Sequence, residues 1–322
     1  MERVKNLFIC ATPLQSLIAA KIIEVRKLEK TDCFLFYYSK VRNSKIDYYY
    51  QSLSEKCTQS TFHECQGGIH RRAAIARNFF QEVDYTNVYF ASAHSIYVQW
   101  ALSQKKHVKI FTFDDGNANL TPVSRLNTKY GHSLKKHIAS MFLGNTYSID
   151  KIKAETIEHY TIYPDYRNNI SDNLKPLDLF DMAGNCAQVG RCAVVLGTVF
   201  DDAFGSNNAE NVQSRLNGFM NSLDQDTFFI PHPRDKHVRA GNYQIIEFDR
   251  IAEELIVDLH KNYGTIDLYG FCSSTQIHLA KCDYINNYFF STYYEQDSIG
   301  AMREHCNEIG IKPKEVINID LF

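Results

Sequence analysis

The sequence alternates short apolar segments with longer segments of helical spacing, and this alternation limits the fold class more than any other feature. In the first half of the chain, apolar segments that indicate strands lie at 4–11, 33–38, 87–91 and 108–113. Segments that indicate helices lie at 14–29, 48–56, 69–82 and 95–102. Apolar strands that alternate with helices form parallel sheets covered by helices on both faces. Residues 1–165 are therefore predicted to form a Rossmann-like domain.

A second alternating block follows a break in the pattern. Its predicted strands lie at 192–196, 227–230, 265–271 and 283–290, and its predicted helices at 210–223, 249–262 and from 276 onward. Proline, asparagine and glycine interrupt the pattern between 166 and 189, as is typical of a linker. We therefore expect an α/β protein of two Rossmann-like domains facing a cleft, at 1–165 and 190–322, with 166–189 as the linker. A chain of 322 residues is long enough for two domains.

Composition argues against several classes of protein and of site. The formal net charge of −2 gives no reason to expect a nucleic-acid partner. The 9 cysteines contain no CxxC pair and the histidines lack metal-ligand spacing, so we expect thiols in a reducing compartment and no bound metal. No apolar run approaches the roughly 20 residues that span a bilayer, and the opening residues do not form a signal peptide. The sequence predicts a soluble, cytoplasmic protein, with contact to a membrane surface left open.

A histidine between two prolines stands at the end of one predicted strand. The apolar segment 227–230 runs directly into Pro231-His232-Pro233-Arg234. Each proline fixes its own φ and favours an extended residue before it, so His232 sits on stiff backbone two residues from a cation. Ligands of open α/β sheets bind at the carboxyl ends of the strands. His232 is therefore a candidate catalytic group, although a plain surface turn explains this segment alone equally well.

The predicted strand at 265–271 ends in small hydroxyl residues that open a helix. Gly270 lies within this strand, and Ser273 and Ser274 follow it. Helix N-termini present unpaired N–H groups that suit a phosphate, and serine hydroxyls add further donors. Ordinary N-capping by serine is the alternative. Because His232 lies at another strand end of the same block, one phosphate could meet the histidine and the serines together.

Two further strand ends carry adjacent carboxylates. The strand at 192–196 continues through Gly197-Thr198 to Asp201-Asp202. Such carboxylates can act as a general base, and the glycine permits close approach of a ligand. The alternative is a helix N-cap near Ala203, which explains the carboxylates at least as well.

The second carboxylate pair is Asp114-Asp115-Gly116, at the end of the predicted strand 108–113. It could supply a base or a metal ligand. For this motif alone, an Asp-Gly turn with helix-capping carboxylates is the better interpretation.

The motifs gain weight from their order and spacing along most of the chain. They are Asn6-Leu7-Phe8-Ile9-Cys10 with Thr12 and Leu14-Gln15, Val88-Tyr89-Phe90-Ala91-Ser92, Phe111-Thr112-Phe113-Asp114-Asp115-Gly116, Glu158-His159-Tyr160-Thr161-Ile162, Leu196-Gly197-Thr198, Pro231-His232-Pro233-Arg234, and the serine after Phe271-Cys272. Together they resemble the bacterial lipooligosaccharide sialyltransferases of glycosyltransferase family 52.

This resemblance implies the two-domain GT-B glycosyltransferase fold, with an acceptor-side N-terminal domain and a nucleotide-sugar-binding C-terminal domain. It implies inverting transfer of sialic acid from CMP-sialic acid to a terminal galactose of a lipooligosaccharide or capsular glycan, with α2,3 linkage. No cofactor is implied beyond the donor substrate, and peripheral contact with the inner face of the plasma membrane and a homodimer stay open.

The resemblance also assigns residues. His232 would serve the departing phosphate, and the base would be Asp201 or Asp202, because this chain holds one extra residue after the Leu-Gly-Thr strand end. Another sialyltransferase family of similar fold uses an aspartate of an Asp-Asp-Gly motif, so Asp115 is a third candidate. The expected substrate-binding residues are Gly197, Thr198, Pro233, Arg234, Gly270, Ser273, Ser274, Thr12, Gln15 and Gly116.

Two rival functions remain at this point. The first is a transferase of the same fold that uses another nucleotide sugar, such as a UDP-hexose. The second is a non-catalytic nucleotide- or glycan-binding protein, which the coexistence of acid and base candidates disfavours.

Overall fold

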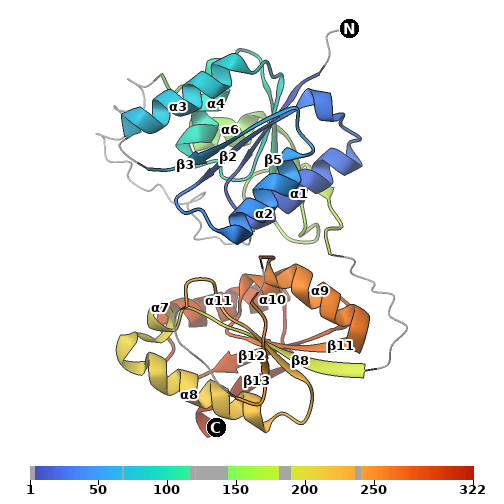
Figure 1. Cartoon of the computed structure of the whole chain (residues 1–322), viewed down its shortest axis with the longest axis vertical. Coiled ribbons are helices and arrows are strands. Elements are labelled where there is room, and N and C mark those ends of the chain that lie inside the picture. The colour runs from blue at the N-terminus through green and yellow to red at the C-terminus, as the bar shows by residue number, and fades with distance from the viewer. Residues whose placement is uncertain are drawn as a thin grey trace. The chain divides into compact units, whose positions relative to one another are not determined.

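The computed structural model divides the chain into two compact units, Met1–Leu179 and Phe180–Phe322 (Figure 1). The structure describes residues 4–66, 69–116, 120, 144–180, 190–235, 241–247 and 249–322. The division falls inside the predicted linker, of which residues 181–189 lie outside the described part.

Unit 1 contains an alternating series of strands and helices. They are β1 (Asn6–Cys10), α1 (Pro13–Val25), a 3-10 turn (Lys30–Asp32), β2 (Cys33–Ser39), α2 (Ser44–Ser54), β3 (Gln59–Glu64), α3 (Ile69–Glu82), β4 (Asn87–Phe90), α4 (Ile96–Gln104), β5 (Lys109–Phe113), α6 (Ile149–Glu155), β6 (Thr156–Thr161) and β7 (Leu174–Pro176). The strands pair in the order β3-β2-β1-β4-β5-β6-β7, and all of these pairs are parallel.

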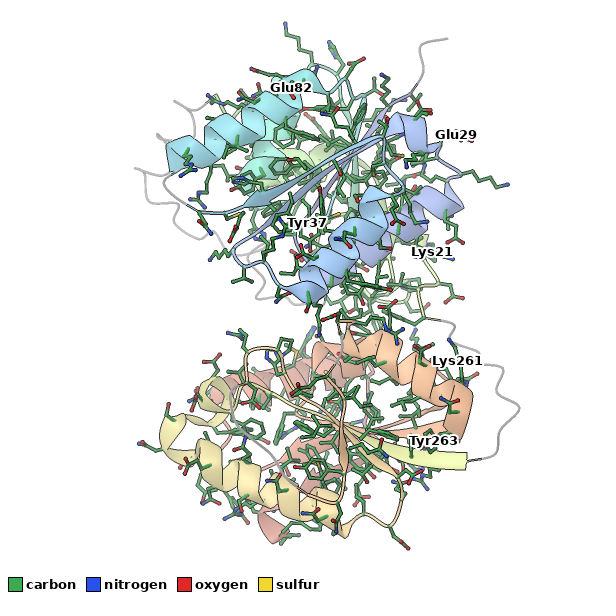
Figure 2. All side chains as sticks on the ribbon, in the orientation of Figure 1. Lys21, Glu29, Tyr37, Glu82, Lys261 and Tyr263 are labelled. Carbon is green, nitrogen blue, oxygen red and sulfur yellow. The ribbon has the colours of Figure 1, made fainter. Side chains whose placement is uncertain are left out.

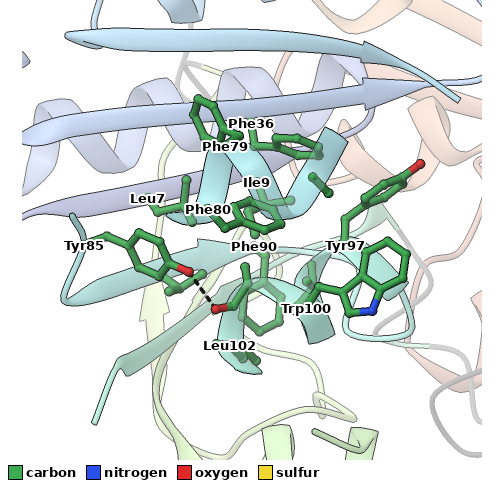
Figure 3. Packing of buried hydrophobic residues seen from close by; sticks show 14 of the residues in the cluster. Leu7, Ile9, Phe36, Phe79, Phe80, Tyr85, Phe90, Tyr97, Trp100 and Leu102 are labelled. Atoms are coloured by element: carbon green, nitrogen blue, oxygen red, sulfur yellow. Dashed lines mark hydrogen bonds between the residues drawn. The ribbon is translucent and has the colours of Figure 1, made fainter. Parts of the chain in front are cut away.

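Helices cover both faces of this sheet (Figure 1). On one face, Ile18, Ile22 and Leu53 of α1 and α2 pack on apolar strand residues. On the other face, α3, α4 and α6 bury a second cluster, in which Phe36 and Trp100 are fully buried. Figure 3 shows this cluster and the hydrogen bond that the Tyr85 hydroxyl donates to the Ala101 carbonyl at 2.7 Å. The doubly wound arrangement follows from strands that are apolar on both faces.

Unit 2 repeats the pattern. They are β8 (Gly190–Leu196), α7 (Phe200–Phe204), α8 (Ser206–Ser222), β9 (Thr227–Ile230), β10 (Gln244–Ile245), α9 (Ala252–Tyr263), β11 (Gly264–Gly270), α10 (Ser274–His278), β12 (Ile285–Ser291), α11 (Asp297–Glu308), β13 (Glu315–Asn318) and a 3-10 turn (Ile319–Leu321). The strand order is β10-β9-β8-β11-β12-β13, again with parallel pairs. Side chains fill the space between sheet and helices in each unit (Figure 2).

The two sheets share one topological feature that locates their sites. Counted along each unit, both have the strand order 3-2-1-4-5-6, and unit 1 adds a seventh strand. In such sheets the chain turns outward in opposite directions from the first and fourth strands, and ligands bind at the carboxyl ends of these two strands. The reversal lies between β1 and β4 in unit 1 and between β8 and β11 in unit 2.

Several elements were not predicted from the sequence, among them β3 and β7. β3 has the sequence QSTFHE and is largely half-exposed, so it lacks an apolar run. β7 falls in the predicted linker, yet it pairs with β6 through the Leu177 amide and the Thr161 carbonyl, among other contacts. Within the described residues, no helix combines the length and the apolar character needed to cross a bilayer.

Candidate functional site

In unit 2, His232 lies just beyond β9 and its ring is oriented by its own loop. The backbone N–H of Arg234 donates to Nδ1 of His232 at 3.2 Å. An imidazole whose Nδ1 accepts a hydrogen bond carries its proton on Nε2 when it is neutral. The loop therefore favours the tautomer in which His232 carries its N–H on Nε2. A phosphate oxygen can accept a hydrogen bond from such a donor.

Gly197 lets the end of β8 pack directly against the histidine loop. A Cβ atom at Gly197 would lie 2.8 Å from the backbone nitrogen of His232 and 3.1 Å from Cα of Pro231. The Gly197 N–H also donates to the Ile230 carbonyl at 2.8 Å. This predicted binding residue thus fixes the spacing of two loops, which any side chain would push apart.

The acidic pair Asp201-Asp202 lies on α7, the short helix that follows this strand end. Both side chains are exposed, and the N-cap position is Val199, without a side-chain hydrogen bond. Asp202 forms an ion pair with Arg234 at 3.3 Å. The carboxylates therefore do not occupy the N-cap position, and one of them is tied to the histidine loop.

Ser273 follows β11, across the point of strand reversal. Its Oγ accepts a hydrogen bond from the Gln276 N–H at 3.3 Å, and its own N–H donates to Gln276 Oε1 at 3.1 Å, which forms a capping box. The hydroxyl hydrogen is not used in this arrangement. Ser274 is the first residue of α10 and is exposed. Capping is thus a real role of Ser273, and its hydroxyl can still donate to a ligand.

Gln276 holds the end of β11 in place from inside the unit. Its side chain is fully buried and donates to Asn287 Oδ1 and to the Tyr288 carbonyl, each at 2.8 Å. A Cβ at Gly270 would lie 2.7 Å from Gln276 Oε1. Gly270 therefore makes room for the glutamine that caps Ser273, which is a packing role.

The residue before Ser273 has an unusual backbone and an unusual neighbour. Cys272 has φ of +59°, in the left-handed region, and its Sγ lies 3.0 Å from Sγ of Cys306. The hydrogen bond to Cys306, and burial next, raise the pKa of the Cys272 thiol, while the same hydrogen bond lowers the pKa of Cys306. The two thiols anchor the Ser273 loop to α11. Cysteine counting could not find this pair, because the two residues are far apart in sequence.

In unit 1, the neighbours Asp114 and Asp115 have different surroundings. Asp114 is fully buried, and it accepts hydrogen bonds from Thr161 Oγ1 and the Ile162 N–H, both at 2.8 Å. His159 Nε2 lies 2.9 Å from its other oxygen. Asp114 therefore joins β5 to β6 inside the fold, which is neither the turn nor the cap that the sequence favoured for this motif.

Asp115 follows β5, the neighbour of β4 in the sheet, and is half-buried. Gln15 Nε2 donates to Oδ1 of Asp115 at 2.7 Å, and Ser92 Oγ donates to Oδ2 at 2.7 Å. Gln15 lies in the first turn of α1, after β1, and Ser92 follows β4, so segments after the first, fourth and fifth strands meet at this carboxylate. Ser92 was not predicted as a site residue, although its place directly after a buried strand is the signal that identified the others.

The remaining predicted residues of unit 1 support this arrangement. Thr12 is the N-cap of α1, and its Oγ1 accepts from the Gln15 N–H at 3.3 Å. Gly116 has φ of +59°, a conformation that favours glycine. Asp115, Gln15, Thr12 and Gly116 belong to unit 1, whereas the other predicted site residues belong to unit 2.

Comparison of the sequence with known proteins identifies relatives of this chain. An N-acetyllactosaminide alpha-2,3-sialyltransferase of Haemophilus influenzae is 29% identical over 279 residues, which cover 85% of this chain and 88% of that protein. A CMP-N-acetylneuraminate:beta-galactoside alpha-2,3-sialyltransferase of Pasteurella multocida is 29% identical over 315 residues, which cover 95% and 97%.

Fold comparison agrees with the sequence comparison. The crystal structure of a sialyltransferase from Photobacterium damsela matches with a TM-score of 0.55 and 17% identity, covering 98% of this chain and 81% of that one. The prediction of a GT-B fold with two parallel-sheet α/β domains is confirmed. The family model of glycosyltransferase family 52 matches residues 30–292, and the chain belongs to this family.

Proposed function

We propose that this glycosyltransferase moves sialic acid from CMP-sialic acid to a terminal galactose, with α2,3 linkage and inversion at the anomeric carbon. The observation that carries the donor assignment is the histidine loop of unit 2. This loop offers a histidine N–H, and the Ser273 hydroxyl follows β11, on the other side of β8 in the sheet. A departing nucleotide phosphate requires hydrogen-bond donors of this kind. The names of the Haemophilus influenzae and Pasteurella multocida relatives support the sugar and the linkage.

The proposed chemistry is a single displacement. The galactose hydroxyl oxygen attacks the anomeric carbon as the bond from that carbon to the CMP phosphate oxygen breaks, and the hydroxyl proton passes to an aspartate. His232 donates to the phosphate oxygen on which charge develops, and Ser273 adds a second donor. Donors aimed at developing charge lower the barrier more than they strengthen ground-state binding. We assign the base to the Asp201–Asp202 pair, as the family pattern implies.

We propose that neither a metal nor a cofactor takes part in the step. The leaving group is a phosphate monoester, and protein donors can meet its charge. Gly197 and Gly270 contribute by setting the loop spacing, and Arg234 adds positive charge beside the histidine. Turnover that is unchanged after exhaustive chelation would support this proposal, and turnover restored only by added Mg²⁺ would contradict it.

Turnover of CMP-sialic acid in the presence of lactose tests the function. We expect release of CMP together with sialyllactose, whose linkage NMR would show to be α2,3. Turnover of a UDP-sugar instead would assign a different donor to the same fold. Tight CMP binding with no turnover of any nucleotide sugar would identify a binding protein.

Two further proposals concern the location of the enzyme in the cell and its oligomeric state. A lipooligosaccharide or capsular glycan under synthesis would bring the enzyme to the inner face of the bacterial plasma membrane, so we propose peripheral contact there. We also propose that the enzyme is a homodimer. Flotation with anionic vesicles and light scattering would test these points. Protein that stays entirely in the dense fraction, or a monomer mass at assay concentration, would contradict them.

A further inference from the structure

The polar network around Asp115 lies at the carboxyl edge of the unit 1 sheet, outside the apolar clusters that form the core of this unit. Its members lie on three segments, which follow β1, β4 and β5, and β1 and β4 flank the point of strand reversal. Gln15 and Ser92 are buried, at 2% and 7% exposure, whereas Asp115 remains partly accessible. A half-buried carboxylate that is held from behind by buried donors presents its accessible side to whatever binds at the edge.

The hydrogen atoms of the network can be assigned one by one. Gln15 Oε1 accepts from the Ala11 N–H at 2.7 Å, which fixes the orientation of the amide. The two hydrogens of Gln15 Nε2 then point to Asp115 Oδ1 at 2.7 Å and to Ser92 Oγ at 3.2 Å. Ser92 has one hydroxyl hydrogen, and it goes to Asp115 Oδ2 at 2.7 Å. Each oxygen of Asp115 therefore accepts from one fixed donor.

Tyr38 lies near Asp115 and is neutral. Burial raises the pKa of Tyr38, a hydrogen bond with Ser95 opposes this only in part, and the negative charge of Asp115 raises the pKa further, so the phenol stays protonated. The described donors to Asp115 are an amide and a hydroxyl, whereas Asp202 on α7 is paired with a guanidinium. A carboxylate that these uncharged donors orient suits acceptance of a hydrogen bond from a sugar hydroxyl.

We propose that Gln15 and Ser92 are positioning residues, which hold the Asp115 carboxylate in one orientation so that it accepts a hydrogen bond from a hydroxyl of the sugar substrate. This inference rests on the proposed glycosyl transfer, and it changes the role of Gln15 from substrate contact to support of Asp115. The two residues act through Asp115 and do not touch the sugar.

The test compares Ser92→Ala and Gln15→Met in the full-length enzyme, with Ser92→Thr as the variant that keeps the hydroxyl. Ser16→Ala is the matched control, because Ser16 is equally buried on α1 and its hydroxyl bonds to the Thr12 carbonyl rather than to Asp115. We expect kcat/KM for the galactose acceptor to fall about 10- to 100-fold in both variants, since misplacing a positioned group by about 1 Å has effects of this size. KM for CMP-sialic acid should stay at the wild-type value, and Ser92→Thr should recover most of the loss.

A purely structural role would give a different result. Lower melting temperatures in Ser92→Ala and Gln15→Met, with acceptor kinetics unchanged, would overturn the proposal. Should Gln15→Met not fold, Ser92→Ala and its threonine rescue decide the outcome alone.

A crystallographic comparison separates failure of this inference from failure of the proposed function. Asp115 should occupy one rotamer in the wild-type enzyme and several in Ser92→Ala. The same single rotamer in the variant would overturn the positioning role, whatever substrate the enzyme turns over. Absence of wild-type turnover with CMP-sialic acid would instead count against the proposed donor.

Discussion

The carboxylate of Asp202 lies 3.3 Å from the guanidinium of Arg234, so helix α7 and the loop after β9 are joined by an ion pair. Both side chains are largely exposed, at 65% and 70%. Exposed pairs of this kind contribute little to stability. The pair therefore matters chiefly for the electrostatics of the histidine loop, and it distinguishes Asp202 from its neighbour Asp201.

The first prediction concerns the base. Asp201→Asn should lower kcat for sialyl transfer about 10²–10⁴-fold, the range for removal of a general base. Asp202→Asn should have a smaller effect, because this carboxylate already interacts with Arg234. Asp115→Asn should chiefly raise KM for the acceptor. Steady-state kinetics with both substrates measures this, and near-normal transfer in both unit 2 variants, with none in Asp115→Asn, would move the base to Asp115.

The second prediction concerns the histidine. His232→Ala should lower kcat about 10²–10⁴-fold with little change in KM for the donor, because its hydrogen bond strengthens as charge develops on the phosphate. His232→Gln keeps an N–H donor but cannot transfer a proton, so its rate separates hydrogen bonding from acid catalysis. A higher KM for the donor with unchanged kcat in His232→Ala would show that His232 contributes only to ground-state binding of the donor.

The third prediction separates the two serines. Ser273→Ala should lower the free energy of unfolding by about 1 kcal/mol, because an N-cap is lost. It should also weaken CMP binding by about 1–3 kcal/mol if the hydroxyl meets the phosphate. Ser274 is exposed, and its loss should leave stability unchanged. Urea unfolding and calorimetric titration with CMP measure the two effects, and equal CMP affinity in folded Ser273→Ala would rule out the phosphate contact.

The fourth prediction concerns the close approach at Gly197. A methyl group there would meet the His232 backbone nitrogen at 2.8 Å and the Phe229 ring at 3.0 Å. Gly197→Ala should therefore cost about 1–3 kcal/mol of stability and displace the histidine loop, with a loss of activity. Gly300→Ala is the control, because nothing lies within 4 Å of its added methyl and it lies in α11. It should be stabilising by up to about 1 kcal/mol, and equal unfolding midpoints for the two variants would refute the steric argument.

The fifth prediction is a pH dependence of stability. Burial opposes ionisation of Glu253, yet the hydrogen bond and charge of His278, at 2.6 Å, hold the pKa of this carboxyl below its usual value. A depressed carboxyl pKa stabilises the fold above the unfolded-state pKa of about 4.3, and this stability is lost as pH falls through the folded-state pKa.

Glu253→Gln should therefore lower stability at pH 7 by about 3–5 kcal/mol, since one partner of a buried pair is removed. It should also flatten the acid limb of the stability curve, which urea unfolding between pH 7 and 3 would show. Glu24→Gln, which breaks an exposed pair with Lys21, should do neither. A wild-type acid limb in Glu253→Gln would mean that another group titrates there.

The alternation of apolar strands and helices was enough to predict the two α/β units, because buried parallel strands are read from local sequence. The strand at 227–230 and the helix at 69–82 have the bounds that the sequence predicts. Helix α11 was missed because its sequence, DSIGAMREHCNE, has few apolar residues. Edge strands such as β3 escape for the same reason.

Strand-end reasoning also selected the residues of the candidate site, but it did not predict their contacts. It could not tell Asp114 from Asp115, because what separates them is a contact with His159 from β6 and with Gln15 from α1. Pairings between distant segments depend on the folded sheet. For the same reason, Ser92 and the Cys272–Cys306 contact became visible only in three dimensions.

The hydrogen-bond network of Asp115 has a thermodynamic consequence for ligand binding. Gln15, Ser92 and Asp115 all belong to unit 1, and folding of its sheet alone brings them together. The conformational entropy of this carboxylate is thus lost during folding rather than when the sugar arrives. A ligand that meets a preorganised group loses less of its interaction energy to ordering the protein.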